Sequence, residues 1–480
     1  MLLEPAHGRA GCDVSMFPPA DPLPGESRLG GGGAEFGSDL RLLRRMTYGA
    51  TYQDRAMMAA LGREAYVDWQ LAHESIDVSA LEAELEVSYP WLRMSAAEMV
   101  DGWIQEVDIG HAEVAITRAI RSPRQLYERV VEMWNDHFNI TSSGLTLAWT
   151  RAVDERDVIR AHAMGTFRAL LGASARSAAM VLYLDNAKNI AAAPNENYAR
   201  EVMELHTTGV GAYTEQDVRE VARCFTGWTN HLANAGEAAL TFKFDPALHD
   251  DGEKVVLGRV IPAGGGIGDG EAVLDILASH PATARHVSGR VARHFITPAP
   301  SQGLVDQLAG VFTATGGDIR AVVREALSTR CQAHAKPKFQ RPFHFAVGVA
   351  RALEAAMPHA GQLRLKLAQA GHMPLKWETP DGYPDRTSYW AGALLWRWRF
   401  AASLMYNEMT GVEVDVPRLM FGARNVEQIA DRIDSIVFGG TMPMMMRVLL
   451  EDYLRANNPS NGVMAEALGL AISSAEYQWF

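Results

Sequence analysis

The chain has few cysteines, no long apolar run and fewer basic than acidic residues. Its three cysteines, Cys12, Cys224 and Cys331, lie far apart, which excludes a disulfide framework or a CxxC metal pair and is typical of a reducing cytoplasm. No run of about 18 apolar residues indicates a membrane span. The 45 basic and 57 acidic residues give a net charge of -12, so we do not expect a nucleic-acid partner.

The first residues, up to about position 33, are rich in proline and glycine and show no helical period. This composition predicts a flexible lead-in over residues 1–35. The stretch also has no apolar segment of the kind that forms the core of a secretory signal. Together with the cysteine usage, this predicts a cytoplasmic location.

The rest of the chain predicts a mainly α fold, a large multi-helix orthogonal or bundle-like arrangement. Thr51, Ser95 and Thr214 stand where they can cap helices. Residues 240–244 and 254–261 alternate like strands and predict a small β-hairpin insertion at about 240–262. We expect a helical domain over residues 36–405 and a C-terminal helical extension, residues 406–480, packed on it.

One helix, predicted over residues 195–209, carries an unusual density of ionisable groups. Asn195 is its expected N-cap and Gly209 its expected C-terminal left-handed residue. At 100° per residue, Glu201 and Glu204 share a polar face with Arg200 and are close enough to act together. His206 points to the apolar face, so the three side chains do not form a metal motif on one face.

Two more helices direct a histidine toward the interior. His137 lies on the apolar face of a helix over residues 123–139, together with Trp134, and His162 lies on the inner side of a helix over residues 154–172. Buried imidazoles need partners. A metal ion, a haem iron or a carboxylate network would satisfy histidines that converge, and three independent core histidines are the alternative.

The expected site follows from these helices. His137, His162 and His206 are its candidate metal or haem ligands, with iron, copper or haem as the cofactor. Asp136, Arg200, Glu201 and Glu204 are its candidate groups for proton transfer and orientation, and Trp134, Asn197 and Arg160 are expected to contact the cofactor. The glycine run at 264–270 matches neither GxGxxG nor GK[ST], so no nucleotide cofactor is expected.

The chain resembles a large bacterial family that is catalogued only as a domain of unknown function. The resemblance covers roughly residues 36 to 405 and implies a mainly helical fold, but it implies no activity. The motifs that carry it are Leu42-Leu43-Arg44-Arg45-x-Thr47-Tyr48-Gly49, Trp134-x-x-His137-Phe138, Leu182-Tyr183-Leu184-Asp185-Asn186, the helix Asn195-Glu196-Asn197-Tyr198-Ala199-Arg200-Glu201-x-x-Glu204-Leu205-His206-Thr207-x-Gly209, His249-Asp250-x-Gly252-x-Lys254-x-x-Leu257-Gly258 and Trp377-x-Thr379-Pro380-Asp381-Gly382-Tyr383-Pro384-Asp385.

Three functions remain open at this point. The preferred hypothesis is a metal- or haem-dependent oxidoreductase with its site built from histidines on separate helices. The first alternative is a non-catalytic helical assembly or maturation partner, in which a buried ion network fixes the helices. The second is a hydrolase that uses the Glu201/Glu204 pair. An enzyme would take a small molecule or a peptide as substrate, and a non-catalytic protein would bind a protein partner or form a homo-oligomer.

Overall fold

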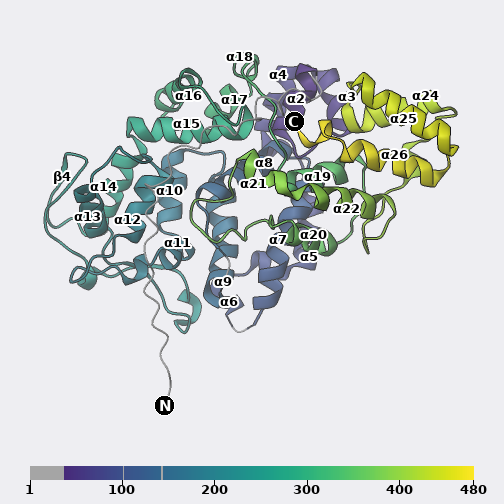
Figure 1. The fold of residues 1–480 in the computed structure, drawn as a ribbon. Helices are drawn as coiled ribbons and strands as arrows, with labels where there is room; N and C mark the ends of the chain where they lie inside the picture. Colours follow the sequence, from purple (N-terminus) through teal and green to yellow (C-terminus); the bar gives the residue numbers. More distant parts are fainter. Residues whose placement is uncertain (1–36, 101, 142–143) are drawn as a thin grey trace.

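The computed structural model describes residues 37–100, 102–141 and 144–480, and the lead-in expected over residues 1–35 lies outside them. The described chain is built from helices, with two small antiparallel two-stranded sheets (Figure 1). The predicted mainly α class is therefore confirmed.

In chain order, the helices have the following bounds. The first half contains α2 (Ser38–Met46), α3 (Tyr52–Leu61), α4 (Arg63–Leu71), α5 (Ser79–Ser88), α6 (Ala96–Met99), α7 (Ile104–Arg121), α8 (Gln125–His137), α9 (Leu145–Asp154), α10 (Phe167–Ala175), α11 (Ala178–Tyr183), α12 (Asn197–Glu201) and α13 (Glu215–Cys224). The second half contains α14 (Ile267–Ala278), α15 (Pro281–Phe295), α16 (Gln302–Ala314), α17 (Ile319–Ala326), α18 (Thr329–Gln332), α19 (Pro342–Ala352), α20 (Gly361–Gln369), α21 (Thr387–Trp390), α22 (Leu394–Met405), α23 (Val416–Leu419), α24 (Val426–Ile433), α25 (Met444–Asn457) and α26 (Asn461–Ser473).

Three helix starts are fixed by the caps that the sequence predicts. The hydroxyl of Thr51 accepts a hydrogen bond from the amide of Asp54, and the Asp54 carboxylate accepts one from the Thr51 amide. Ser95 forms the same reciprocal arrangement at α6, and Thr214 forms it at α13. Each such capping box satisfies two amides that the helix itself leaves unpaired.

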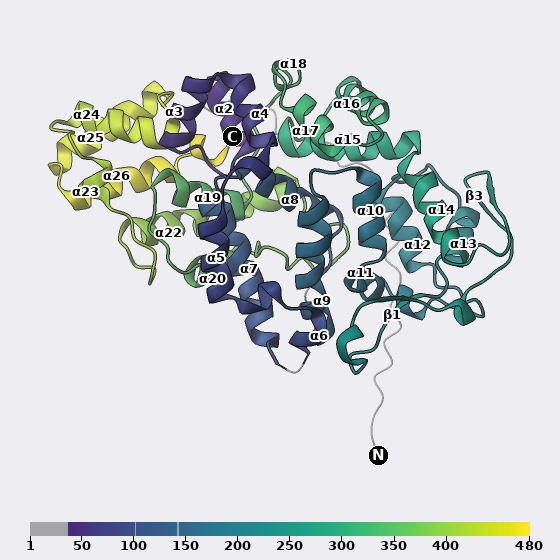
Figure 2. The same ribbon diagram turned by 180° about the vertical axis from the view of Figure 1, so that it is seen from behind.

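One continuous core joins the ends of the chain. Leu40 of α2 and Tyr477 near the C-terminus belong to the same cluster of buried apolar side chains, and α8 contributes to it along its length. Figures 1 and 2 both place α24 to α26 beside α2 and α3, with α13, α14 and the strands at the opposite end of the molecule. The division at residue 405 stays a prediction.

A small hairpin within about 240–262 is confirmed, but the two predicted strands do not pair with each other. β2 (Phe242–Phe244) pairs with an earlier strand, β1 (Trp228–Asn230), and residues 254–261 fold back on themselves as β3 (Lys254–Val256) and β4 (Arg259–Ile261). The reason is the turn at Leu257-Gly258, where both residues have positive φ, at 49° and 75°. A two-residue turn of this kind closes a tight hairpin.

The two helices expected around the site residues are also shorter than predicted. The helix expected over 154–172 is interrupted, because a π-helical segment, η4 (Glu155–Arg160), extends α9 and Thr166 then caps a separate helix, α10. The helix expected over 195–209 consists of α12 followed by a second π-helical segment, η6 (Val202–His206). π-helical turns occur frequently at functional sites, and these two carry predicted site residues.

Candidate functional site

Segments from four of the sequence motifs meet at the C-terminal end of α8. The Tyr183 hydroxyl donates to the Glu378 carbonyl at 2.7 Å, and the Asn139 amide donates to the carbonyls of Trp377 and Thr379 at 3.0 and 2.7 Å. These bonds hold the loop of residues 377–385 against both α8 and α11. The Asn197 side chain ties α12 to the same region.

A glycine lets the 377–385 loop pack directly on α8. Gly382 has φ of 74°, and a Cβ atom there would lie 2.0 Å from the carbonyl oxygen of Asp136. Only glycine accepts both this conformation and this close approach. The same carbonyl also accepts a hydrogen bond from Arg290 of α15 at 2.7 Å. Asp136 is thus enclosed between the loop and α15.

The structure brings together two of the three predicted histidines. The rings of His137 and His206 lie 6.1 Å apart, and His286 of α15, 6.0 Å from His137, completes a cluster. His162 is half-buried near the end of the α9–η4 helix and makes no ring contact with His137 or His206 within the described residues. Sequence reasoning missed His286 because no local pattern distinguishes it from other polar residues of its helix.

The histidine cluster does not supply the ligand set of a metal ion that is bound by protein side chains alone. His137 Nε2 donates to the His206 carbonyl at 2.9 Å, and His286 Nε2 donates to the Leu205 carbonyl at 3.0 Å. Among the ring nitrogens of this cluster, His137 Nδ1 and His206 Nε2 are buried without a hydrogen-bond partner within the described residues. Structural and catalytic zinc sites use three or four protein ligands, and the described residues contain no group of three or more His, Cys, Asp or Glu side chains placed to hold a metal.

Burial keeps these histidines neutral. It lowers the pKa of His137 well below its usual value, that of His206 to about 3 and that of His286 to about 4, with the nearby charge of Arg290 acting in the same direction. A cation beside the cluster also disfavours a second positive charge, such as a metal ion. We therefore derive no catalytic step from an iron or copper ion bound by these histidines, and haem stays a prediction.

The cluster should make the protein sensitive to acid. Because these pKa values lie below the unfolded value of about 6.5, the folded state binds fewer protons, so stability present above pH 6.5 is lost as pH falls toward 4. His286→Gln is expected to reduce the slope of unfolding free energy against pH over this window. Urea unfolding between pH 7 and 4.5 measures the slope, and equal slopes for both proteins would contradict the prediction.

A row of carboxylates on α8 forms a buried ion network. Glu132 accepts from Arg341 at 2.5 Å, from Arg129 at 2.8 Å and pairs with His344 at 2.6 Å. Burial alone would raise the pKa of Glu132, but these three groups hold it well below its usual value. Asp136, one turn further on, pairs with Arg341 at 2.7 Å. These charges lock α8 to α19.

Asp136 and Arg160, two of the predicted site residues, belong to this buried network. Burial raises the pKa of Asp136 although Arg341 opposes the shift. Arg160 donates two 2.8 Å hydrogen bonds to Glu128, one turn before Glu132. The cavity beside this row has a volume of only about 50 Å³. It has no room for a substrate larger than a few waters, so we regard the row as structural.

Two predicted cofactor contacts also anchor the scaffold. Trp134 is fully buried, and its indole nitrogen donates to the Ala163 carbonyl at 3.0 Å. The Asn197 side chain donates to the Leu184 carbonyl at 3.1 Å. Both side chains hold one helix to a neighbouring segment.

Glu201 is a partly exposed carboxylate whose pKa is strongly raised. It is half-buried on α12, and burial followed by the charge of Glu204 raises its pKa to about 7. Glu204 accepts a hydrogen bond from the Tyr213 hydroxyl at 2.9 Å. Arg200 opposes the shift, but its guanidinium binds Glu215 through two bonds of 2.7 and 2.8 Å. Arg200 therefore belongs to a surface ion pair.

The 377–385 loop adds a third carboxylate to this place. Asp381 contributes to the raised pKa of Glu201 and accepts hydrogen bonds from the Trp377 indole at 3.1 Å and from the Thr379 hydroxyl at 2.5 Å. Asp381 lies 180 positions after Glu201 in the chain, so no spacing rule could connect the two. The Glu201 site, as we call it, consists of Glu201, Glu204 and Asp381.

The raised pKa of Glu201 predicts a stability change with pH. Its folded pKa lies above the unfolded value of about 4.3, so the folded state binds more protons and stability falls as pH rises from about 4.5 through 7. Glu201→Gln should therefore be more stable than the wild type at pH 8 and closely similar at pH 4.5. Chemical unfolding at both pH values tests this, and a destabilised variant at pH 8 would contradict it.

Fold and site together define a large, mainly helical protein with an acidic surface site next to a buried ion network. In the described part of the chain no helix combines the length and apolarity needed to cross a membrane. The chain belongs to the family described as protein of unknown function (DUF1800), whose model matches residues 41–479. The match confirms the resemblance and runs through the C-terminal helices. No curated protein and no solved structure matches the chain.

Proposed function

We propose that this protein is a hydrolase that works by general acid–base catalysis at the Glu201 site. The observation that carries the proposal is the placement of Glu201, half-buried and close to the charges of Glu204 and Asp381, which together raise its pKa to about 7. A carboxylic acid that keeps its proton near neutral pH can give it up to a leaving group. Strongly shifted groups of this kind are enriched at active sites.

The roles follow from the surroundings of each carboxylate. Glu204, held by the Tyr213 hydroxyl, accepts the proton of an attacking water. The water oxygen bonds to the reacting carbon, the bond from that carbon to the leaving oxygen or nitrogen breaks, and Glu201 protonates the leaving atom. Asp381, fixed by Trp377 and Thr379, contributes negative charge that keeps Glu201 protonated before the reaction.

The charge of the site indicates the substrate class. The charges of Glu204 and Asp381 both act on Glu201, and Arg200 pairs with Glu215. Such a site disfavours anions, because like charges repel. We therefore expect a neutral or cationic substrate, a glycoside or a peptide, and we do not expect a phosphodiester.

A substrate panel tests the proposal. Neutral glycosides and peptides with a chromogenic leaving group should be hydrolysed, and the rate should fall above about pH 7 as Glu201 loses its proton. Anionic phosphodiesters serve as the comparison. Absence of turnover on every neutral substrate would reject the proposal and favour the non-catalytic partner. The metal-dependent oxidoreductase stays a prediction that the geometry of the histidine cluster supports less well.

A further inference from the structure

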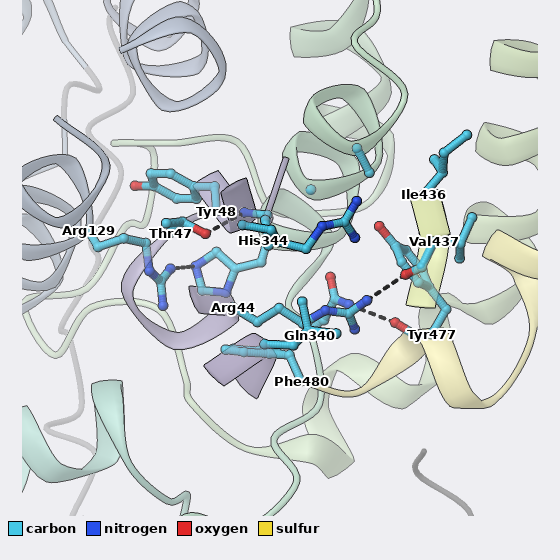
Figure 3. A pocket seen from close by; sticks show the side chains of 16 residues that line it. Arg44, Thr47, Tyr48, Arg129, Gln340, His344, Ile436, Val437, Tyr477 and Phe480 are labelled. Atoms are coloured by element: carbon cyan, nitrogen blue, oxygen red, sulfur yellow. Dashed lines mark hydrogen bonds between the residues drawn. The ribbon is translucent and has the colours of Figure 1, made fainter. Parts of the chain in front are cut away.

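A small cavity with a basic lining lies at the end of the buried network farther from the Glu201 site. It has a volume of about 30 Å³ and is enclosed by α2, α3, α8, α19 and the C-terminal segment. Figure 3 shows Arg44, Arg129, His344 and Gln340 gathered around it. Arg55 of α3 adds a third guanidinium. Within the described chain, no aspartate or glutamate lines this cavity.

Two of the lining groups are buried with free hydrogen-bonding capacity. Arg129 is 1% exposed and directs Nη1 to Glu132 and to His344, whereas its Nε and Nη2 atoms are buried without a partner among the described residues. His344 Nδ1 is also buried without a hydrogen-bond partner among the described residues. A buried donor without a partner costs on the order of 1–3 kcal/mol, more when it is charged.

The carboxylate that pairs with Arg129 is shared with two other cations. Glu132 already pairs with Arg129, Arg341 and His344, and it does not line the cavity. Arg55 donates to the backbone carbonyl of Ser435 and is in no ion pair within the described residues. The cavity therefore collects basic groups from several elements, while the carboxylates that act on them, Glu132 on Arg129 and Asp54 and Asp434 on Arg55, lie outside its lining.

We propose that this cavity binds one small inorganic anion, of the size of chloride. A volume of about 30 Å³ holds a single ion of that size, a water-sized occupant. The free donors of Arg129 and the charge of Arg55 are the groups that would bind it. Bound there, the anion would link α3, α8 and α19 and so stabilise the junction between the N-terminal helices and the C-terminal segment. This site is separate from the Glu201 site.

Thermal unfolding of the full chain tests the anion site. At constant ionic strength, replacing gluconate, which is too large for the cavity, by chloride should raise Tm saturably, by roughly 2–3 °C at a hundredfold excess over Kd. Arg55→Gln should abolish the rise. Arg432→Gln is the matched control, because Arg432 also donates to a backbone carbonyl, that of Phe421, but does not line the cavity; it should keep the rise.

Crystallography with bromide tests the anion site directly and does not require that Arg55→Gln folds. A crystal of the wild-type protein grown in bromide should show an anomalous peak in the cavity, next to Arg129. Any one of three outcomes would overturn the proposal. They are no chloride-specific rise in Tm, an equal rise in Arg55→Gln, or an adventitious ion only, with bromide bound elsewhere and not in the cavity. These outcomes do not depend on hydrolytic activity, so they separate failure of this proposal from failure of the Glu201 mechanism.

Discussion

Glu201→Gln is expected to lower kcat/KM by about 10²–10⁴-fold on a substrate that the wild type hydrolyses. The amide matches the shape of the carboxylic acid but cannot transfer a proton to the leaving group. The measurement is steady-state hydrolysis at pH 6, where wild-type Glu201, with a pKa of about 7, is mostly protonated.

The control for this variant is Glu237→Gln, an exposed glutamate far from the Glu201 site in the sequence. It should keep wild-type activity. The leaving group gives a second check, because a substrate whose leaving group needs no protonation should lose much less activity in Glu201→Gln. An equal loss on both kinds of substrate would contradict the role of Glu201 as the acid.

Arg341→Met is expected to cost about 3–5 kcal/mol of unfolding free energy. Arg341 is 3% exposed and binds Glu132 at 2.5 Å and Asp136 at 2.7 Å. Methionine fills part of the volume but leaves Asp136 buried without its cation and removes one of the three partners of Glu132. Urea unfolding at neutral pH measures the loss.

An exposed ion pair provides the comparison for Arg341→Met. Arg324 pairs with Asp68 at 2.8 Å, and both side chains are about half exposed, at 53% and 52%. Arg324→Met should cost no more than about 1 kcal/mol, because water and salt screen such pairs. If the two variants cost the same, the network on α8 does not lock the helices as proposed.

The sequence predicts the helical class and several helix starts because these depend on local chemistry. The capping boxes at Thr51 and Thr214 need only residues three positions apart. The amphipathic pattern of α8 likewise places Trp134 and His137 in the interior, and the structure buries both. A pattern read at 100° per residue therefore works wherever the helix is regular.

The site depends on features that local chemistry does not encode. The π-helical turns η4 and η6 change the helical period near Arg160 and Glu204. A helical wheel drawn at 100° per residue therefore cannot place these two side chains. His286 joins the histidine cluster from a position 80 residues after His206. Asp381 joins the Glu201 site from a position 180 residues after Glu201. Convergence over such distances is set by the packing of whole helices, and Gly382 lets the loop approach α8 closely.

The most direct test of the account is the pKa of Glu201 itself. Carboxyl ¹³C NMR, with the Glu201 signal assigned by its absence from Glu201→Gln, follows this one group through a pH titration. The account predicts a midpoint near 7 in the wild type, and a lower midpoint in Glu204→Gln, because the neighbouring charge is then removed. A midpoint near the usual value of about 4.3 would contradict the central claim.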